Sequence, residues 1–183
     1  MTITTIARSV HPTSLGSLLI EATVTGISRV TFTHKGPAGP TGESRSAREL
    51  VSAAAAQIDE YLAGERRDFS TPMDRSAMSA FDREVLGTLE SSTGYGESTT
   101  YGALTRELGR APADARKIGG ALARNRLLIL IPCHRVVGAD GSLTGYAGGL
   151  PVKRTLLDLE SVDTMLPLML GWAGPRSRSA ETQ

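Results

Sequence analysis

The chain has 183 residues, of which 40% are hydrophobic and 21% charged, and its formal net charge is +1. This length and composition suit one ordinary domain or two small ones with a real core, and they exclude a disordered or fibrous chain. The bulk charge does not indicate a nucleic-acid partner, so any basic surface has to be local.

The chain holds one cysteine, Cys133, which excludes an internal disulfide framework and a zinc site built on cysteines. Its three histidines are too scattered for metal-ligand spacing, and we expect no metal. The first ten residues lack the apolar run of a signal peptide, and the longest apolar runs are too short to cross a bilayer. We therefore expect a cytoplasmic protein with no membrane partner.

The N-terminal half predicts a small unit of strands and one helix. Ser17–Thr23 and Ile27–Thr33 are apolar or alternating runs on either side of a Thr-Gly turn, which indicates a β-hairpin. The Gly- and Pro-rich segment His34–Ser44 predicts a loop. Helical spacing of apolar residues predicts a helix over Ala47–Ala63, and the charged, Pro-containing stretch Arg66–Asp74 predicts a domain boundary.

A second unit follows, and its pattern is mostly helical. Ser79 can cap a helix, Gly94–Glu97 predicts a turn, and Tyr101–Leu108 predicts a short helix ended by a glycine. Pro112 suits the first turn of a further helix that runs to about Arg124. Two short helices joined by a tight turn are typical of a helix-turn-helix.

The C-terminal part predicts three more elements. Leu127–Ile131 has the apolar run of a buried strand, Ala139–Ser142 predicts a turn, and Pro151–Glu160 predicts a final helix.

These elements predict an α/β chain of the α+β kind. A small domain with an antiparallel sheet and a helix is expected over 1–74, and a mostly helical domain with a winged-helix-like helix-turn-helix over 75–163. The tail over 164–183 is expected to be partly disordered.

The predicted helix-turn-helix is locally basic. Residues 106 to 126 include six basic and two acidic side chains, which gives a local charge of +4. Such an excess is what phosphate contacts require, although a solvated helix face has the same composition. Gly119, Gly120 and Ala121 in the second helix permit close approach of another surface, either a neighbouring helix or a DNA groove.

Cys133 lies in the run Pro132-Cys133-His134-Arg135-Val136. The thiolate is the reactive form of cysteine, and a neighbouring histidine can take the proton of a thiol whose free pKa is about 8.5. A carboxylate behind the histidine can orient it, and Glu160 is the candidate for that role. These residues alone leave an inert core thiol and a cysteine hydrolase open.

The same run closely resembles the active-site motif of the O6-alkylguanine-DNA alkyltransferases, also called methylated-DNA–protein-cysteine methyltransferases. Other segments resemble this family in the same order, over roughly residues 8 to 162. They are Tyr95-Gly96-Glu97 with Tyr101-Gly102, Ala115-Arg116 through Gly119-Gly120-Ala121 to Asn125, Gly145 to Gly149, and Leu156-Leu157 with Glu160. Several ordered motifs are more specific than any one alone.

The resemblance implies a DNA-repair methyltransferase that works once and needs no cofactor. A damaged base in duplex DNA would be flipped into a pocket, and the alkyl group of O6-alkylguanine, and of O4-alkylthymine, would pass irreversibly to Cys133. His134, acting through a water, would keep the sulfur as thiolate, with Glu160 behind it. Asn125 would brace this network and Tyr101 would donate to the leaving base. The partner would be double-stranded DNA containing alkylated guanine, bound by a monomer, with cooperative binding along DNA left open.

The resemblance also assigns two larger sets of residues. Those implied to contact DNA are Thr100, Arg116, Lys117, Gly119, Gly120, Ala121 and Arg124. Those implied to form the substrate pocket are Arg135, Val136, Tyr146, Ala147 and Gly148. Arg116 would take the place of the flipped base in the stack.

Three positions depart from the family pattern. Gly94 and Arg126 stand where proline is usual, and Lys117 replaces a small residue. The changes at 117 and 126 add positive charge, and we hypothesise that they strengthen sequence-independent phosphate binding. The change at 126 also puts the rigidity of the turn after Asn125 in question.

Two other classes of function remain as alternatives. A non-catalytic DNA-binding module, such as a lesion-flagging alkyltransferase-like protein or a helix-turn-helix regulator, would not need Cys133, which the flagging relatives lack. A cysteine hydrolase would turn over many times and retain no adduct. A regulator with a metal-binding methyl sensor is disfavoured, because the chain has no further cysteine.

Overall fold

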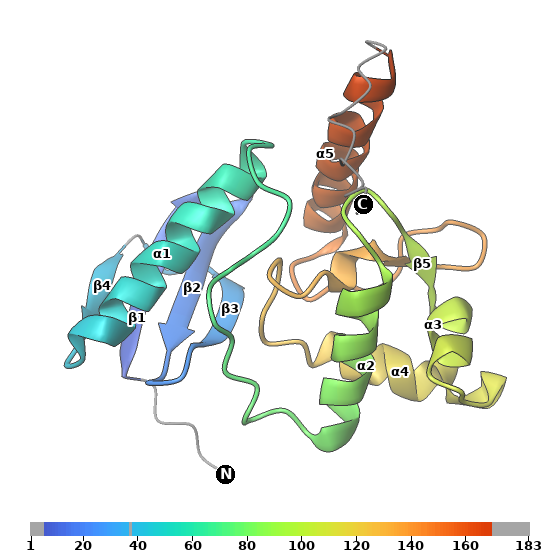
Figure 1. Ribbon diagram of the computed structural model, residues 1–183, viewed down its shortest axis with the longest axis horizontal. Coiled ribbons are helices and arrows are strands. Elements are labelled where there is room, and N and C mark those ends of the chain that lie inside the picture. Colours follow the sequence, from blue (N-terminus) through green and yellow to red (C-terminus); the bar gives the residue numbers. More distant parts are fainter. Residues whose placement is uncertain (1–5, 37, 170–183) are drawn as a thin grey trace, which may run out of the picture.

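The computed structural model describes residues 6–36 and 38–169, the last part of the final helix as backbone only. Its first half is an antiparallel sheet of β1 (Ala7–Thr13), β2 (Gly16–Ala22), β3 (Ile27–Thr33) and β4 (Ala38–Gly42), in the order β3-β2-β1-β4. The helix α1 (Arg45–Leu62) packs along this sheet, and the remaining helices form the other half of the molecule (Figure 1). The two-part α+β architecture predicted from the sequence is therefore confirmed.

The hairpin and the first helix form as predicted. β2 and β3 pair antiparallel with Leu18 opposite Phe32 and Ile20 opposite Val30. α1 begins where the Ser44 side chain accepts a hydrogen bond from the Ala47 amide. It ends before Gly64, whose φ of 78° is left-handed.

Two strands of this sheet were not predicted. β1 precedes the hairpin, and β4 lies within His34–Ser44, the segment predicted as a loop, so that prediction is wrong for residues 38–42. β4 is an exposed edge strand with glycine and proline, and an edge strand tolerates proline because amides on its outer margin make no hydrogen bond to another strand. Because the strand is exposed, its sequence has no alternation to detect.

The second half of the molecule carries the helices. They are α2 (Ala80–Ser92), α3 (Tyr101–Glu107), the 3-10 turn η1 (Pro112–Asp114), α4 (Ala115–Ala123), the 3-10 turn η2 (Cys133–Arg135) and α5 (Leu150–Met169). The short strands β5 (Thr99–Thr100) and β6 (Val136–Val137) pair in parallel beside them. α3 and α4 are the predicted helix-turn-helix, although Pro112 starts a 3-10 turn and the α-helix proper begins at Ala115.

The prediction of a strand over Leu127–Ile131 is wrong. The segment is a buried turn in which the Ile131 amide donates to the Leu127 carbonyl at 2.9 Å, and Ile129 has a left-handed φ of 73°. A short apolar run indicates burial but does not distinguish a strand from a compact turn.

The two halves are joined along the free edge of β3. The Val30 amide donates to the Arg126 carbonyl at 2.7 Å, and the Leu128 amide donates to the Val30 carbonyl at 3.1 Å. Further along, Ile27 exchanges backbone hydrogen bonds with Pro72 and Asp74. Residues leading into the second half therefore continue the sheet of the first.

The final helix is longer than predicted. α5 starts at Leu150 and continues past Glu160 to Met169, so the predicted boundary at 163/164 falls inside it. The rest of the predicted tail, 170–183, lies outside the described residues. No helix in the described part of the chain combines the length and apolarity needed to span a bilayer.

Candidate active site

Cys133 lies at a cavity of about 310 Å³ between the helix-turn-helix and the loop before α5. The residues that line the cavity come from α3, α4, η2 and that loop. They are Tyr101, Gly119, Leu122, Ala123, Cys133, Gly145, Tyr146 and Ala147. This volume is within the range of small-molecule sites, and the lining is mainly apolar with a few polar atoms.

The thiol of Cys133 is held by Asn125. The Asn125 Nδ2 donates to Cys133 Sγ at 3.1 Å and to the Ile131 carbonyl at 3.0 Å, while its Oδ1 accepts from the Leu127 amide at 2.9 Å. Burial raises the pKa of the Cys133 thiol to about 11, and the Asn125 hydrogen bond and the Lys153 charge oppose that rise. Cys133 is therefore a thiol at rest, and its reaction requires a proton acceptor.

His134 and Glu160 form the predicted pair. His134 Nε2 lies 3.0 Å from Glu160 Oε1, and both side chains are fully buried. Burial lowers the pKa of His134, while the Glu160 hydrogen bond and charge oppose it. Because the ionised carboxylate can only accept, Nε2 carries the proton, and Nδ1 is the basic nitrogen. Nδ1 is buried and makes no hydrogen bond to the described residues.

Glu160 accepts hydrogen bonds from several directions. Arg135 donates from Nε to Oε2 at 2.9 Å and from Nη2 to Oε1 at 3.0 Å, and the Gly96 amide donates to Oε2 at 3.2 Å. Burial alone would raise the pKa of Glu160, but hydrogen bonds from His134 and Arg135 lower it to about 2. The carboxylate is therefore ionised, and Arg135 balances its charge.

The prediction that Arg135 and Val136 line the substrate pocket is not supported by their positions. Arg135 is turned toward Glu160 and the Thr93 carbonyl, and Val136 is fully buried in β6, so neither lines the cavity at Cys133. Gly148 is not among the cavity-lining residues either, and a Cβ atom there would meet the rings of Phe32 and Tyr146 at 2.6 and 2.7 Å. Tyr146 and Ala147 do line the cavity.

Two tyrosines face the cavity. The Tyr101 hydroxyl accepts a hydrogen bond from Thr144 Oγ1 at 3.2 Å. The Tyr146 hydroxyl is buried without a hydrogen-bond partner among the described residues, and its ring packs edge-on against His134. An unpaired buried hydroxyl in a cavity is a group available to a ligand.

Sequence reasoning missed two buried polar residues at this site. Tyr61 from α1 donates from its hydroxyl to Glu160 Oε1 at 2.5 Å. Lys153 from α5 is fully buried and donates to the carbonyls of Val136 and Thr144 at 2.5 and 2.7 Å. Both lie at helical positions where the spacing indicates packing. The only hint in the sequence is that a charge or a hydroxyl stands where an apolar side chain is expected.

Of the residues predicted to contact DNA, six lie on α4 or at its C-terminal cap, and Thr100 lies at the start of α3. Arg116 is exposed near the start of α4, and Lys117 is exposed but paired with Asp114 at 2.8 Å. Arg124 is exposed and makes a two-pronged ion pair with Asp82. Thr100 caps α3 by accepting from the Ala103 amide.

The predicted small-residue surface of α4 is only partly exposed. Gly119 and Gly120 are half-buried, and a Cβ atom at Gly119 would lie 3.5 Å from the Tyr101 ring. Ala121 is fully buried beside Ile118 and Leu122, so the prediction that Ala121 contacts DNA is wrong. The helix turns Ala121 inward because it shares the buried stripe of those two residues.

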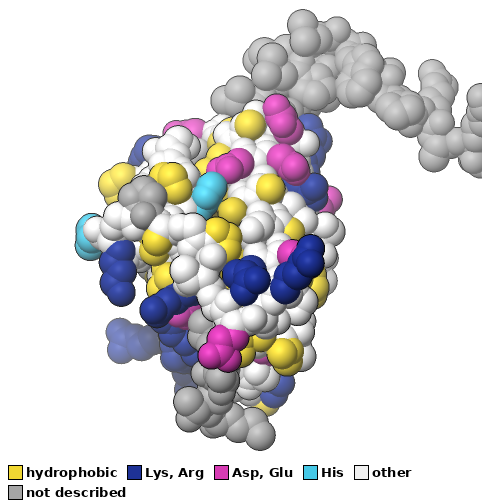
Figure 2. Space-filling model, turned by 90° about the vertical axis from the view of Figure 1, so that its left-hand side faces the viewer, with side chains coloured by type: hydrophobic (Ala, Val, Ile, Leu, Met, Phe, Trp, Pro, Cys, Tyr) yellow, Lys and Arg dark blue, Asp and Glu magenta, His cyan; other side chains and the backbone are white. Residues whose placement is uncertain are grey.

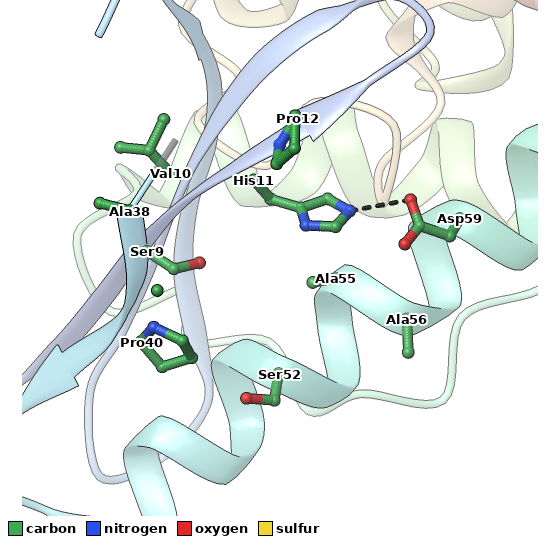
Figure 3. A pocket seen from close by; sticks show the side chains of 11 residues that line it. Ser9, Val10, His11, Pro12, Ala38, Pro40, Ser52, Ala55, Ala56 and Asp59 are labelled. Atoms are coloured by element: carbon green, nitrogen blue, oxygen red, sulfur yellow. Dashed lines mark hydrogen bonds and ion pairs between the residues drawn. The ribbon is translucent and has the colours of Figure 1, made fainter. Parts of the chain in front are cut away.

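A larger cavity, of about 490 Å³, lies far from Cys133 in the N-terminal half. Figure 3 shows it between β1, β4 and α1, with His11 Nε2 paired to Asp59 at 2.8 Å at one end. The surrounding face carries basic, acidic and hydrophobic side chains intermixed (Figure 2). It is an open groove of mainly small side chains, and nothing in its lining singles out a ligand.

Two family models match the chain. Residues 80–162 match the model described as 6-O-methylguanine DNA methyltransferase, DNA binding domain. Residues 6–75 match the model described as 6-O-methylguanine DNA methyltransferase, ribonuclease-like domain. Both halves of the molecule are therefore accounted for by one kind of protein.

Individual proteins give the same result. A methylated-DNA–protein-cysteine methyltransferase of Mycobacterium leprae is 42% identical over 117 residues, 64% of this chain and 69% of the relative. One of Haemophilus influenzae is 32% identical over 160 residues, 87% of this chain and 88% of the relative. The crystal structure of Mycobacterium tuberculosis OGT in complex with DNA superposes with a TM-score of 0.71 at 32% identity, covering 86% of this chain and 93% of that chain.

Proposed function

Because the chain belongs to the methylated-DNA–protein-cysteine methyltransferase family of DNA-repair proteins, we propose that Cys133 is the residue that accepts the alkyl group. The observation that carries this proposal is the position of Cys133 at a cavity of about 310 Å³, with Asn125 on its sulfur. His134, the next residue in the chain, forms a buried pair with Glu160. The substrate is O6-alkylguanine, and also O4-alkylthymine, in duplex DNA.

The reaction is a displacement at the alkyl carbon. The base is flipped out of the duplex into the cavity, since the sulfur is out of reach of a stacked base. A bond forms between Cys133 Sγ and the alkyl carbon while the bond from that carbon to O6 breaks, and the electron pair goes to the guanine ring. The thiol proton passes through a water to His134 Nδ1, and Tyr101 donates a proton to the ring. The Tyr101 phenolate then regains a proton from the solvent, to which His134 returns the thiol proton. One proton leaves the thiol and one is gained by guanine, so no cofactor is required.

The helix-turn-helix of α3 and α4 is the proposed DNA-binding element. Arg116 supports this, because it is exposed at the start of α4 and no ion pair to an acidic side chain is seen for it in the described part of the chain. An arginine on α4 three residues before Gly119, which lines the cavity, can occupy the space that a flipped base leaves in the stack. Binding as a monomer remains a prediction.

The test is intact-mass analysis after incubation with duplex DNA that contains O6-methylguanine. We expect a stoichiometric mass gain of one methylene group, located on Cys133, and equal loss of the lesion. A Cys133→Ala protein should bind the DNA without gaining mass. Repeated turnover without an adduct would indicate a hydrolase instead, and lesion removal by Cys133→Ala would refute the proposal.

A further inference from the structure

The residues of the proposed transfer reaction all belong to the second half of the molecule, with one exception. Tyr61 comes from α1 in the first half, 99 residues before Glu160 in the chain, yet its hydroxyl lies 2.5 Å from Glu160 Oε1 and 3.4 Å from His134 Nε2. Tyr61 is only 1% exposed. From this geometry we infer that Tyr61 is a positioning residue of the alkyl-transfer reaction, through which the N-terminal half sets the orientation and proton affinity of the Glu160–His134 pair.

Tyr61 reaches this place because of its register on α1. The buried residues of the helix are Ala47, Val51, Ala54, Ile58 and Tyr61. Their spacing gives one continuous stripe against the sheet, and Tyr61 is its last member. The ring contacts Phe69 and Tyr95, with centroid distances of 5.3 and 5.9 Å, while the hydroxyl itself is held by its hydrogen bond to Glu160.

The direction of the hydrogen bond follows from the charges around it. Burial raises the pKa of Tyr61, and the Glu160 charge raises it further, so the hydroxyl keeps its proton and donates it to the carboxylate. His134 donates to the same oxygen, Oε1. Tyr61 and His134 therefore donate to the same carboxylate oxygen, so the hydrogen bond from one weakens the attraction of that oxygen for the other.

Removal of the Tyr61 hydroxyl would change the proton affinity of His134. With one donor fewer, the Glu160 charge is less satisfied and attracts the imidazolium form of His134 more strongly. The other charged or titratable groups around the pair are Arg135 and Cys133 from η2, Lys153 from α5, and Tyr95 and Tyr146 from the adjoining loops. None of these changes in a Tyr61→Phe variant, which keeps the ring.

A second contact between the halves acts on the same site. The Val30 amide of β3 holds the Arg126 carbonyl, next to the residue that bonds the sulfur. The N-terminal half thus fixes the thiol side through the backbone and the proton-acceptor side through Tyr61. Of these two contacts, only the one made by Tyr61 can alter the titration of His134.

The experiment measures single-turnover alkyl transfer by the full chain from about pH 5 to about pH 9, together with the NMR titration of the His134 ring. For Tyr61→Phe we expect transfer slowed by roughly tenfold and the acid limb of the rate profile shifted upward by about half a pH unit, with a matching shift of His134. Phe69→Leu, which loosens the packing of Tyr61 but keeps its hydroxyl, is the control and should shift neither midpoint.

A rate profile and a His134 titration that coincide with those of the parent protein would overturn the inference, whatever happened to stability. An equal shift in Phe69→Leu would also overturn it, because packing alone would then explain the effect. The inference rests on the proposed function, and the two fail differently. Lesion removal by Cys133→Ala refutes the function, whereas an inactive Cys133→Ala beside an unaltered Tyr61→Phe refutes only the role of Tyr61.

Discussion

Asn125 holds the Cys133 sulfur and the buried turn that follows it with a single side chain. Its amide makes three hydrogen bonds, to the sulfur, to a carbonyl and to an amide of the buried turn. The Leu127 and Ile131 bonds fix the side-chain rotamer, so the donor to Cys133 is already in place before substrate arrives. A fixed donor stabilises the developing thiolate more than one that must first be ordered.

Glu160 should make the stability of the protein depend on acid pH. Its pKa falls from an ordinary 4.5 to about 2 in the folded protein, so folding favours the ionised form. Its contribution is therefore fully present above about pH 4.5 and is lost as the pH falls toward 2, by roughly 3 kcal/mol in all. Urea unfolding at a series of pH values measures this loss.

Glu160→Gln is the matched variant for that measurement. It leaves the buried Arg135 without its counter-charge, so we expect a less stable protein at neutral pH and a flatter profile below pH 4.5. Parallel pH profiles for the two proteins would show that the acid sensitivity comes from other carboxyl groups.

At the residue scale, the motifs predicted two contacts of the site. Asn125 donates to the Cys133 sulfur, and Glu160 pairs with His134, as expected. Tyr61 and Lys153 could not be found in the same way, because each occupies a helix position whose pattern indicates packing alone. What distinguishes them is the partner across the interface, and a sequence does not state which distant element a helix will face.

At the scale of elements, strong periodicity and capping were reliable guides. Ser79 caps α2 as predicted, and α1 and the hairpin end close to the expected residues. β4 and the Leu127–Ile131 turn show where the patterns fail. An exposed edge strand needs no apolar face, and a fully buried segment has no polar face, so neither alternates.

The basic side chains on the helix-turn-helix and just after it differ in whether they pair with an acidic side chain. Lys117 is paired with Asp114, whereas Arg126 makes no ion pair to an acidic side chain in the part of the chain described here. A cation that must first leave an acidic partner contributes less to phosphate binding than one that is free.

Arg126→Ala should therefore lower the slope of log affinity against log salt by about one, and Lys117→Ala by less. DNA affinity measured over a range of salt concentrations provides both slopes. If neither variant changed its slope, these two departures from the family pattern would have no part in phosphate binding.

At the scale of the whole molecule, the loop before α5, which helps to line the cavity at Cys133, packs against the sheet of the N-terminal half. Phe32 of β3 fills the space beside Gly148, where a Cβ atom would lie 2.6 Å from its ring and 2.7 Å from that of Tyr146. Contacts of this length require one of the three residues to move. The glycine therefore allows the loop to lie directly against the N-terminal half.

Gly148→Ala should reduce both stability, by about 1–3 kcal/mol, and the rate of alkyl transfer, because Tyr146 is displaced at the cavity. Gly145→Ala in the same loop is the control for stability, since a Cβ atom there meets nothing within 4 Å. Thermal unfolding of both variants is the measurement. Equal unfolding temperatures would mean that the loop adjusts without cost.

The substitution of arginine for the usual proline at 126 suggested a less rigid turn. In the folded protein the Arg126 carbonyl is held by Val30, and the Asn125 side chain spans the turn from within. Rigidity that proline would provide locally is thus provided by hydrogen bonds to another element. A sequence motif cannot show such a replacement, because it depends on how the two halves dock.

The pairing along β3 has a consequence for the solubility of the molecule. β3 is an outer strand, and an outer strand with free amides and carbonyls is a template on which other chains can add. Residues 72–74 and 126–128 bond to Ile27 and Val30 along that margin. The backbone that leads into the nucleophile thus also shields the sheet against aggregation. A chain emerging from the ribosome would lack this cover at Val30 until residue 128 had been made, and newly made protein is most exposed to self-association in that interval.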